Sequence, residues 1–327
     1  MFRSRIRRWL VAVCCVAAVA FVSAAEKDGK FSLAVLRRDG LMIPFATYNG
    51  RAWSVAWPGS NNVPLPISLS DIPKAWWGDV TATTPWTAWL SDSEKRTLKL
   101  EKPVHVPIFC GAHLAVATDY RGAPPSEPAP TVAKDAVATA GEVTLLPVTQ
   151  VSSLSADAKL VVKAITEKFD EEEELASSHF TSWRHPFPPS MRSEIPIELE
   201  TFYRAADTGK NGPFRTSYIE AVRRYPALAG DQGCGLLTFA RGWITEFDKG
   251  KTPIINIGVR ITYCDRADVQ FFQPFGRIVM PGSKNVYWVY QLSSWRDEFY
   301  NVASVGTDGV KPVVVVAGGG CPKDPAR

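Results

Sequence analysis

The chain has 327 residues, an apolar fraction of 46% and a formal net charge of +4. This length and apolar content predict one large or two ordinary globular domains with buried cores and argue against a disordered chain. The positive charge comes from four arginines in the first eight residues: without them, 33 basic residues of the original 37 stand against 33 acidic ones, and the rest of the chain is formally neutral. A role in binding nucleic acid or an anionic membrane therefore lacks an electrostatic basis.

The N-terminus has the three parts of a secretory signal peptide. A basic head ends at Arg8, an apolar stretch covers residues 9–22, and Ser23-Ala24-Ala25 precedes the charged Glu26. This pattern predicts cleavage after residue 25. An uncleaved membrane span is the alternative, but the apolar stretch is shorter than the roughly 20 residues that a helix needs to cross a bilayer. The sequence therefore predicts an exported protein, periplasmic or extracellular, with no integral membrane span after cleavage.

Residues 26–121 are predicted to form a tryptophan-rich β-meander. Apolar runs at residues 31–37, 41–48 and 51–57 are separated by Arg38-Asp39-Gly40 and by Asn49-Gly50. An Asn-Gly pair between apolar runs is a strong hairpin indication, because both residues tolerate positive φ. After an irregular segment rich in proline, serine and asparagine, strand character resumes at residues 97–100 and 104–110.

Six tryptophans of this region are the candidate ligand-binding residues. They fall within 37 residues and are Trp53, Trp57, Trp76, Trp77, Trp86 and Trp89. Flat amphipathic rings with polar neighbours suit stacking against a sugar face or holding a partner's apolar anchor. The alternative is that the same rings point inward as core and fix a long irregular loop.

Residues 122–141 are rich in proline and alanine and lack aromatic side chains, which predicts a linker or an exposed insertion. Residues 142–327 are predicted to hold a helix and an antiparallel β region. The helix is expected at residues 156–176, because Ser155 is a suitable N-cap and Val161, Ile165 and Phe169 recur every fourth position.

Eight short runs of β-branched and aromatic residues follow the helix. They cover residues 197–204, 215–224, 236–247, 254–263, 271–279, 286–293, 298–305 and 310–317. Short, closely spaced strands with turn residues between them predict a mainly β fold, an antiparallel sandwich or partly open barrel with one accessory α-helix. Residues 215–224 are ambiguous with helix, but their aromatic and β-branched context favours a strand.

Four cysteines remain after signal cleavage, an even number that suits disulfide bonds in an oxidising compartment. Cys234 and Cys264 flank two predicted strands joined by the polar turn at residues 248–251, so a hairpin would bring them together. Cys110 and Cys321 would then pair by elimination, closing a loop of about two hundred residues worth roughly 4 to 5 kcal/mol in the chain-entropy model. Free buried thiols are the alternative.

No motif for catalysis, a cofactor or a metal stands out. The acidic run at residues 167–174 could attract calcium, but a continuous helix would splay its carboxylates apart, which favours a solvated face. The histidines lack the spacing of a helical zinc motif, and Ser182 between His179 and His185 lacks the Gly-x-Ser-x-Gly elbow of a hydrolase nucleophile. We therefore predict no cofactor and no metal.

Three functions remain compatible with these observations. The favoured one is an exported, envelope-associated or secreted binding module that acts on a carbohydrate or a protein through an aromatic surface. The second is a secreted hydrolase with a carboxylate pair, for which the candidates are Glu220 with Asp248, Asp265, Asp297 or Glu298. The third is a structural or assembly protein without a small-molecule site.

Overall fold

A computed structural model describes twelve stretches of the chain. They are residues 29–58, 63–64, 66–80, 83–90, 94–123, 133–179, 184–205, 214–227, 235–247, 252–263, 269–280 and 286–321. The predicted signal peptide, Ser182, Cys234 and Cys264 lie outside the described residues. The expectations that concern them remain predictions.

The N-terminal sheet contains eight strands in the order β5-β4-β8-β1-β2-β7-β6, with β3 paired to β2. Its strands are β1 (Phe31–Arg37), β2 (Leu41–Tyr48), β3 (Trp53–Ser54), β4 (Trp86–Leu90), β5 (Lys95–Leu98), β6 (Leu100–Ile108), β7 (Gly111–Thr118) and β8 (Lys134–Gly141). A short 3₁₀ helix η1 (Leu69–Asp71) and the helix α1 (Lys74–Trp77) lie between β3 and β4.

Two five-stranded sheets follow. The outer sheet has the order β10-β11-β12-β13-β14, and the middle sheet has the order β18-β17-β16-β15-β9. Their strands are β9 (Leu145–Leu146), β10 (Val148–Gln150), β11 (Glu198–Ala205), β12 (Phe214–Arg224), β13 (Leu236–Phe247), β14 (Ile254–Tyr263), β15 (Phe271–Val279), β16 (Val286–Ser293), β17 (Asp297–Gly306) and β18 (Gly309–Gly320). The helices α2 (Ala156–Ser178) and α3 (Pro189–Arg192) lie between β10 and β11.

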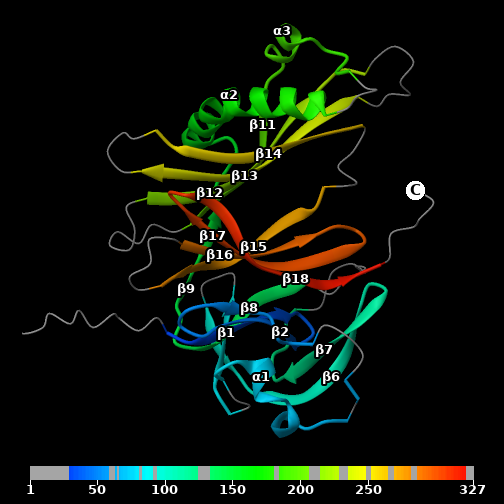
Figure 1. The fold of residues 1–327 in the computed structure, drawn as a ribbon, viewed down its shortest axis with the longest axis vertical. Coiled ribbons are helices and arrows are strands. Elements are labelled where there is room, and N and C mark those ends of the chain that lie inside the picture. Colours follow the sequence, from blue (N-terminus) through cyan, green and yellow to red (C-terminus); the bar gives the residue numbers. More distant parts are fainter. Residues whose placement is uncertain are drawn as a thin grey trace, which may run out of the picture.

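The elements stack in layers from α1 through the N-terminal, middle and outer sheets to α2 (Figure 1). One apolar cluster joins the N-terminal and middle sheets, and includes Phe45 and Tyr300. A second joins the middle and outer sheets, where the indole Nε1 of Trp288 donates to the Thr216 hydroxyl at 2.9 Å. Helix α2 covers the opposite face of the outer sheet with its buried stripe of Val161, Ile165 and Phe169.

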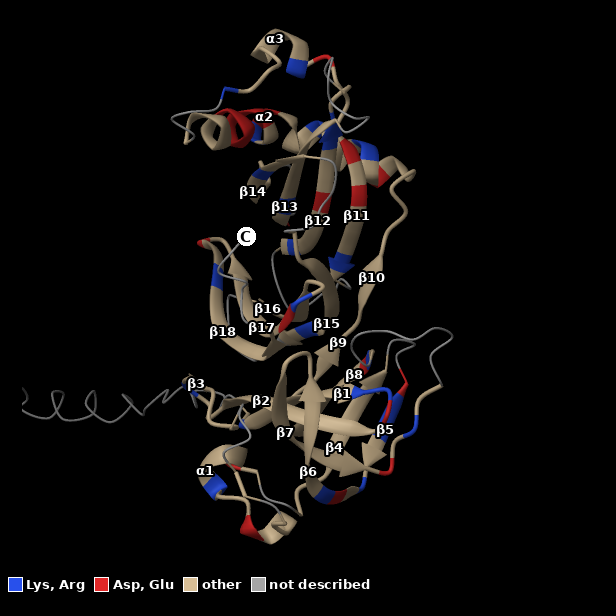
Figure 2. Cartoon of the chain, turned by 90° about the vertical axis from the view of Figure 1, so that its right-hand side faces the viewer, with Lys and Arg blue, Asp and Glu red and all other residues tan. Residues whose placement is uncertain are grey.

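The middle and outer sheets together form a curled half-barrel. The chain passes directly from β9, an edge of the middle sheet, to β10, an edge of the outer sheet, so the two sheets are joined on that side. The opposite edges are β14 and β18, and Figure 2 shows these two strands along the open side of the half-barrel. Both described sheets thus end in a long unpaired edge on the same side of the molecule.

The mainly β prediction is confirmed, and all strand pairs in the described residues are antiparallel. The accessory helix is also confirmed, with the Ser155 hydroxyl accepting from the Ala158 amide at 3.1 Å as N-cap. The ambiguous run near residue 220 is strand β12, and the predicted hairpin of residues 236–247 and 254–263 is the β13–β14 pair.

The prediction for residues 122–141 was wrong in its second half. Lys134–Gly141 is strand β8, which lies between β4 and β1 inside the N-terminal sheet. One of its alanines lies beside a tryptophan: Ala140 pairs with Trp86 across the strands, and both belong to one apolar cluster. A strand made of small residues has the composition of a linker, which explains the error.

Cys110 and Cys321 form a disulfide, as the sequence predicts. Cys110 lies in the tight turn between β6 and β7, and Cys321 follows β18. At this crossing the backbone of Gly319 lies so close to Ile108 that a Cβ on the glycine would come within 2.4 Å of the Ile108 side chain. The bridge therefore ties the last strand of the middle sheet to a hairpin of the N-terminal sheet.

Candidate functional site

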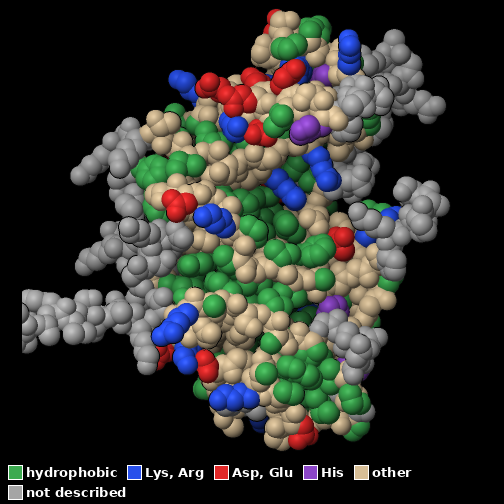
Figure 3. All heavy atoms as spheres, viewed as in Figure 1, with side chains coloured by type: hydrophobic (Ala, Val, Ile, Leu, Met, Phe, Trp, Pro, Cys, Tyr) green, Lys and Arg blue, Asp and Glu red, His purple; other side chains and the backbone are tan. Residues whose placement is uncertain are grey.

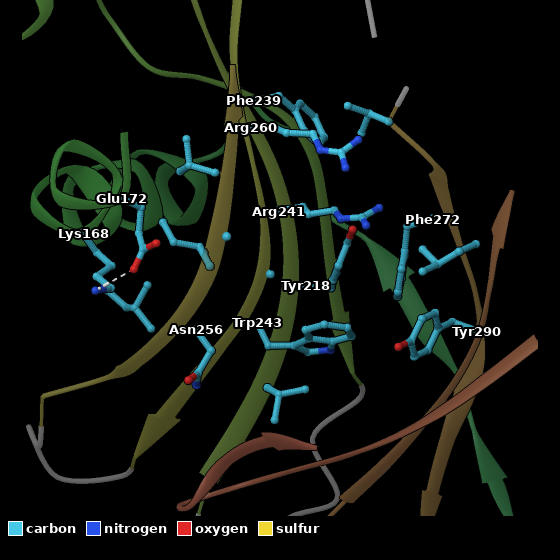
Figure 4. Close-up of a pocket in the computed structure, with 18 residues that line it drawn as sticks. Lys168, Glu172, Tyr218, Phe239, Arg241, Trp243, Asn256, Arg260, Phe272 and Tyr290 are labelled. Carbon is cyan, nitrogen blue, oxygen red and sulfur yellow. Dashed lines mark ion pairs between the residues drawn. The ribbon is translucent and has the colours of Figure 1, made fainter. Parts of the chain in front are cut away.

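A cavity of about 620 Å³ opens on the side of the half-barrel where β14 and β18 are the edges. Its walls come from β12, β13 and β14 of the outer sheet and from β15, β16 and β18 of the middle sheet, and it extends around β14 to α2. Figure 3 shows hydrophobic side chains gathered across the middle of this face, with Lys or Arg side chains beside them. We call this cavity the cleft; Figure 4 shows its lining residues.

The strand register explains which side chains reach the cleft. Tyr218, Trp243 and Asn256 occupy one row across β12, β13 and β14. The next row along the strands holds Glu220, Arg241 and Gly258. A third row ends in Phe239 and Arg260. Because side chains alternate between the two faces of a strand, these residues share the face opposite α2.

Four aromatic rings from four strands form the floor of the cleft. The ring of Tyr218 stacks on Phe272 at a centroid distance of 3.6 Å, and Phe272 stacks on Tyr290 at 4.7 Å. Trp243 meets the rings of Tyr218 and Tyr290 edge-on, at 5.0 Å and 5.6 Å. The rings of Tyr218, Phe272 and Tyr290 are buried, whereas Trp243 is half-buried at the surface of the floor. Trp243 is therefore the ring of this group best placed to meet a ligand.

Most of the charged side chains that the structure describes in the cleft lining are basic. Among the described residues that line it, Lys168, Arg241 and Arg260 are basic, and Glu172 alone is acidic. Glu172 forms an ion pair with Lys168 at 2.9 Å on α2. The Arg241 guanidinium donates to the carbonyl oxygen of Gln270 at 3.3 Å. The cleft thus combines an aromatic floor with two guanidinium groups on neighbouring strands.

Gly258 leaves room above this floor. It is exposed on the edge strand β14, opposite Arg241 in the register, and a Cβ placed on it would meet no atom within 4 Å. A side chain at this position would project over the row that contains Arg241. The space above Gly258 is therefore empty of protein side chains, and a larger residue substituted at this position would fill it.

The tyrosines of the floor carry no charge at neutral pH. Burial raises the pKa of Tyr290 to about 12, against a smaller opposing effect of Arg241. Burial also raises the pKa of Tyr218 well above its usual range, and the neighbouring Glu220 adds to that effect. Glu220 is itself buried, and its carboxylate accepts a hydrogen bond from the Tyr218 hydroxyl at 3.2 Å.

These pKa values predict a loss of stability in alkali. The folded chain keeps the Tyr290 phenol neutral up to about pH 12, whereas an unfolded chain ionises it near pH 10. Between these values the unfolded state has lost the proton that the folded state still binds, so the free energy of unfolding falls as pH rises. Urea unfolding at several pH values between 9 and 12 measures this slope. Tyr290→Phe should make it shallower, and an equal slope in both proteins would contradict the expectation.

The six candidate tryptophans lie outside the cleft. Trp57, Trp76, Trp77 and Trp86 cluster on the face of the N-terminal sheet that α1 covers, with neighbouring ring centroids 5.0 to 6.2 Å apart. Trp53 and Trp89 pack instead against the cluster between the N-terminal and middle sheets. Three of the six, Trp57, Trp77 and Trp86, are buried. The other three, Trp53, Trp76 and Trp89, are half-buried. The structure therefore does not bring all six into one patch, and ligand binding by the half-buried rings stays a prediction.

The acidic run of α2 is not only a solvated face, which corrects the expectation for residues 167–174. Glu173 is 1% exposed, and its carboxylate binds the Arg223 guanidinium at 2.7 Å and the Tyr225 hydroxyl at 2.7 Å. His185 packs edge-on against Tyr225, with its Nε2 atom 3.9 Å from the Glu173 carboxylate. These contacts attach α2 to the end of the outer sheet and leave His185 in a packed loop.

Two carboxylates considered for hydrolysis have structural partners. Glu298 is buried and forms an ion pair with Lys134 at 2.5 Å, and Asp297 accepts a hydrogen bond from the Ser294 hydroxyl at 2.7 Å. Asp248 and Asp265 lie outside the described residues. Within the described part of the chain, no group of three or more His, Cys, Asp or Glu side chains is arranged to hold a metal ion.

No protein-family model, curated protein or solved structure matches this chain. Among the described helices, none combines the length and the apolar character that a membrane-spanning helix requires. Functional inference therefore depends on the cleft itself.

Proposed function

We propose that this protein is a binding module whose aromatic surface is the cleft between the outer and middle sheets. The observation that carries this proposal is the meeting of Tyr218, Trp243, Phe272 and Tyr290, from four strands, on the floor of an open cavity. Apolar side chains complete much of the wall. Concave sites lined mainly by apolar and aromatic groups, with a few polar groups to fix orientation, are typical of small-molecule binding.

The size of the cleft supports a small ligand. Its volume of about 620 Å³ falls in the usual range of small-molecule sites. The half-barrel gives the site a rigid frame, because each wall is a hydrogen-bonded sheet and the two sheets share one apolar cluster. A preformed site loses less conformational entropy on binding than a site that must be ordered first.

Blocking the cleft should abolish binding of a neutral apolar probe. N-phenylnaphthylamine fluoresces more strongly in apolar surroundings, and we expect saturable binding by the wild-type protein. Gly258→Phe should weaken this binding at least tenfold, because the ring would occupy open space above the floor. Fluorescence titration of both proteins measures the difference.

A matched control exists on another sheet. Gly111 is also exposed, and a Cβ there would meet nothing closer than 3.8 Å, so Gly111→Phe adds the same ring far from the cleft. It should bind the probe as the wild type does, and circular dichroism should show that both variants are folded. The proposal would be refuted if Gly258→Phe bound the probe as tightly as the wild type does, or if the wild type did not bind the probe at all.

We further propose that the protein is exported and acts in the cell envelope or outside the cell. The basic and apolar N-terminal pattern supports export, and so does the Cys110–Cys321 disulfide, since such bonds persist mainly in oxidising compartments. The mass of the protein recovered outside the cytoplasm should correspond to a chain that begins at Glu26. A full-length mass in the cytoplasm would contradict this.

A further inference from the structure

We propose that Lys134 and Glu298 condense into a covalent cross-link between the N-terminal and middle sheets. The product is an isopeptide bond between the Nζ atom of Lys134 and the Cδ atom of Glu298, formed with loss of one water molecule. Neither residue lines the cleft, so this modification site is independent of the proposed function. The inference draws on the burial of the pair, on the few hydrogen bonds around it and on a tyrosine that is placed to assist the reaction.

The two reacting groups are held in contact by separate sheets. Lys134 begins β8 of the N-terminal sheet, and Glu298 lies on β17 of the middle sheet, 164 residues further along the chain. The distance from Lys134 Nζ to Glu298 Oε2 is 2.5 Å, and the two side chains are 2% and 0% exposed. The Gln273 side chain of β15 donates to the Lys134 carbonyl oxygen at 3.1 Å, which fixes the start of β8 against the middle sheet. Groups held in such an orientation reach effective molarities of about 10⁵ to 10⁸ M, which favours their condensation over hydrolysis.

Burial favours the uncharged forms that can react. A Lys134 ammonium would offer three N–H donors, whereas among the described residues Glu298 alone accepts a hydrogen bond from it. Transfer of one proton from Nζ to the carboxylate leaves a neutral amine and a neutral acid, which cost less to bury than two poorly bonded charges. Burial lowers the pKa of Lys134, and Arg37, opposite Lys134 in the β1–β8 register, adds to this effect against the attraction of Glu298 and Asp39. The neutral amine has the lone pair that a nucleophile needs.

Tyr300 is placed to activate the carboxyl group. Its hydroxyl donates to Glu298 Oε1, the carboxyl oxygen on the other side from the one that Lys134 contacts. Burial raises the pKa of this phenol well above its usual range, and Glu298 adds to the effect, so the hydroxyl keeps the proton that it donates. Gly318 lets the backbone of β18 pack on both side chains, because a Cβ there would lie 2.6 Å from the Tyr300 ring and 3.0 Å from Glu298 Cγ. The carboxyl group is therefore held between its two partners.

The reaction balances without a cofactor or a co-reactant. The structure shows the pair before this step, as an ion pair. After the proton transfer, the lone pair of Lys134 Nζ attacks Glu298 Cδ and forms the N–C bond, while negative charge develops on Oε1 and is stabilised by the Tyr300 hydroxyl. One proton then passes from the nitrogen to Oε2, the Cδ–Oε2 bond breaks and water leaves. The product replaces two buried charges by one neutral amide, and burial shields that amide from hydrolysis.

Mass spectrometry of the folded wild-type protein tests the proposal. After reduction and denaturation, the chain should be lighter than its sequence by the mass of one water molecule. A tryptic digest should contain peptide 122–159, uncleaved after Lys134, joined to peptide 297–323. The digest locates the loss, which matters because cyclisation of an N-terminal Glu26 would remove the same mass. Lys30 is the internal control: its ion pair is largely exposed to water, so trypsin should cleave after it in the normal way.

Two variants separate condensation from a permanent ion pair. Lys134→Arg keeps the positive charge but should retain the full mass, because a guanidinium stays protonated and is not a nucleophile. Tyr300→Phe keeps both reacting groups, and when it is refolded from urea-solubilised inclusion bodies it should lose water at least about tenfold more slowly than the wild type. Circular dichroism should show that all three proteins are folded.

The wild-type protein decides the outcome even if a variant fails to fold. A folded wild-type chain that keeps its full sequence mass, or that loses water at other residues, would overturn the proposal and leave Lys134 and Glu298 as an ion pair. Cross-linking of Tyr300→Phe at the wild-type rate would overturn the assisting role of the tyrosine.

Discussion

Replacing both Cys110 and Cys321 by serine is expected to lower the free energy of unfolding by about 4 to 5 kcal/mol. The two cysteines are 211 residues apart, so the bridge closes most of the chain into one loop and strongly restricts the unfolded ensemble. It also fixes the crossing of β18 over the β6–β7 turn, where Gly319 and Ile108 are in close contact. Urea unfolding of wild type and variant under non-reducing conditions measures the loss.

Reductant provides the control for this prediction. It should destabilise the wild type by at least this amount, and each single variant, Cys110→Ser or Cys321→Ser, should behave like the double variant. A further loss when the double variant is reduced would support the second bridge predicted between Cys234 and Cys264. A double variant as stable as the wild type would show that the bridge does not restrain the unfolded chain.

The sequence predicted most of the strands because their patterns are local. Turn residues and β-branched runs placed the eight C-terminal strands within a few residues, and Ser155 with the spacing of Val161, Ile165 and Phe169 placed α2. Strand β8 was missed because strands are distinguished from linkers in a sequence by their bulky β-branched and aromatic side chains, which β8 largely lacks. Here the bulky side chain is on the neighbouring strand, since Trp86 lies opposite Ala140.

The burial of individual side chains was harder to predict than the strands. The apolar run at residues 51–57 predicts one strand that carries both Trp53 and Trp57, but the structure has only the two-residue strand β3 there. Such a run also does not say which surfaces will be covered by elements distant in the chain. In the structure these two residues belong to different apolar clusters. Glu173 was missed for a similar reason, because its partners are about fifty residues away in the sequence: Arg223 lies on β12 and Tyr225 lies just after that strand.

The cleft could have been predicted only in part. On β13 the residues Phe239, Arg241 and Trp243 alternate with small or aliphatic ones, which indicates one functional face and one face packed against a helix. No local pattern, however, states that this face would meet Phe272 and Tyr290 of another sheet. The curl of the two sheets creates the site, and that curl depends on packing between strands far apart in the sequence.

Removing the buried partner of Glu298 should have an effect as large as loss of the disulfide. Lys134 and Glu298 are 2% and 0% exposed, and their charged groups are 2.5 Å apart between the N-terminal and middle sheets. Lys134→Met would leave the carboxylate buried with the Tyr300 hydroxyl as a neutral donor. Breaking one side of a buried ion pair typically costs about 3 to 5 kcal/mol, because an uncompensated charge remains in the interior. Urea unfolding again measures the difference.

The second substitution decides whether the pair acts as a unit. Combining Lys134→Met with Glu298→Leu removes both charges. The loss in the free energy of unfolding should then be smaller than the sum of the losses in the two single variants, and the difference equals the coupling energy between the two groups. Lys30→Met is the matched control, because the Lys30–Asp79 pair is largely exposed and its loss should cost less than about 1 kcal/mol. Additive losses in the double variant would mean that the two side chains stabilise the contact between the sheets independently, by packing rather than by charge.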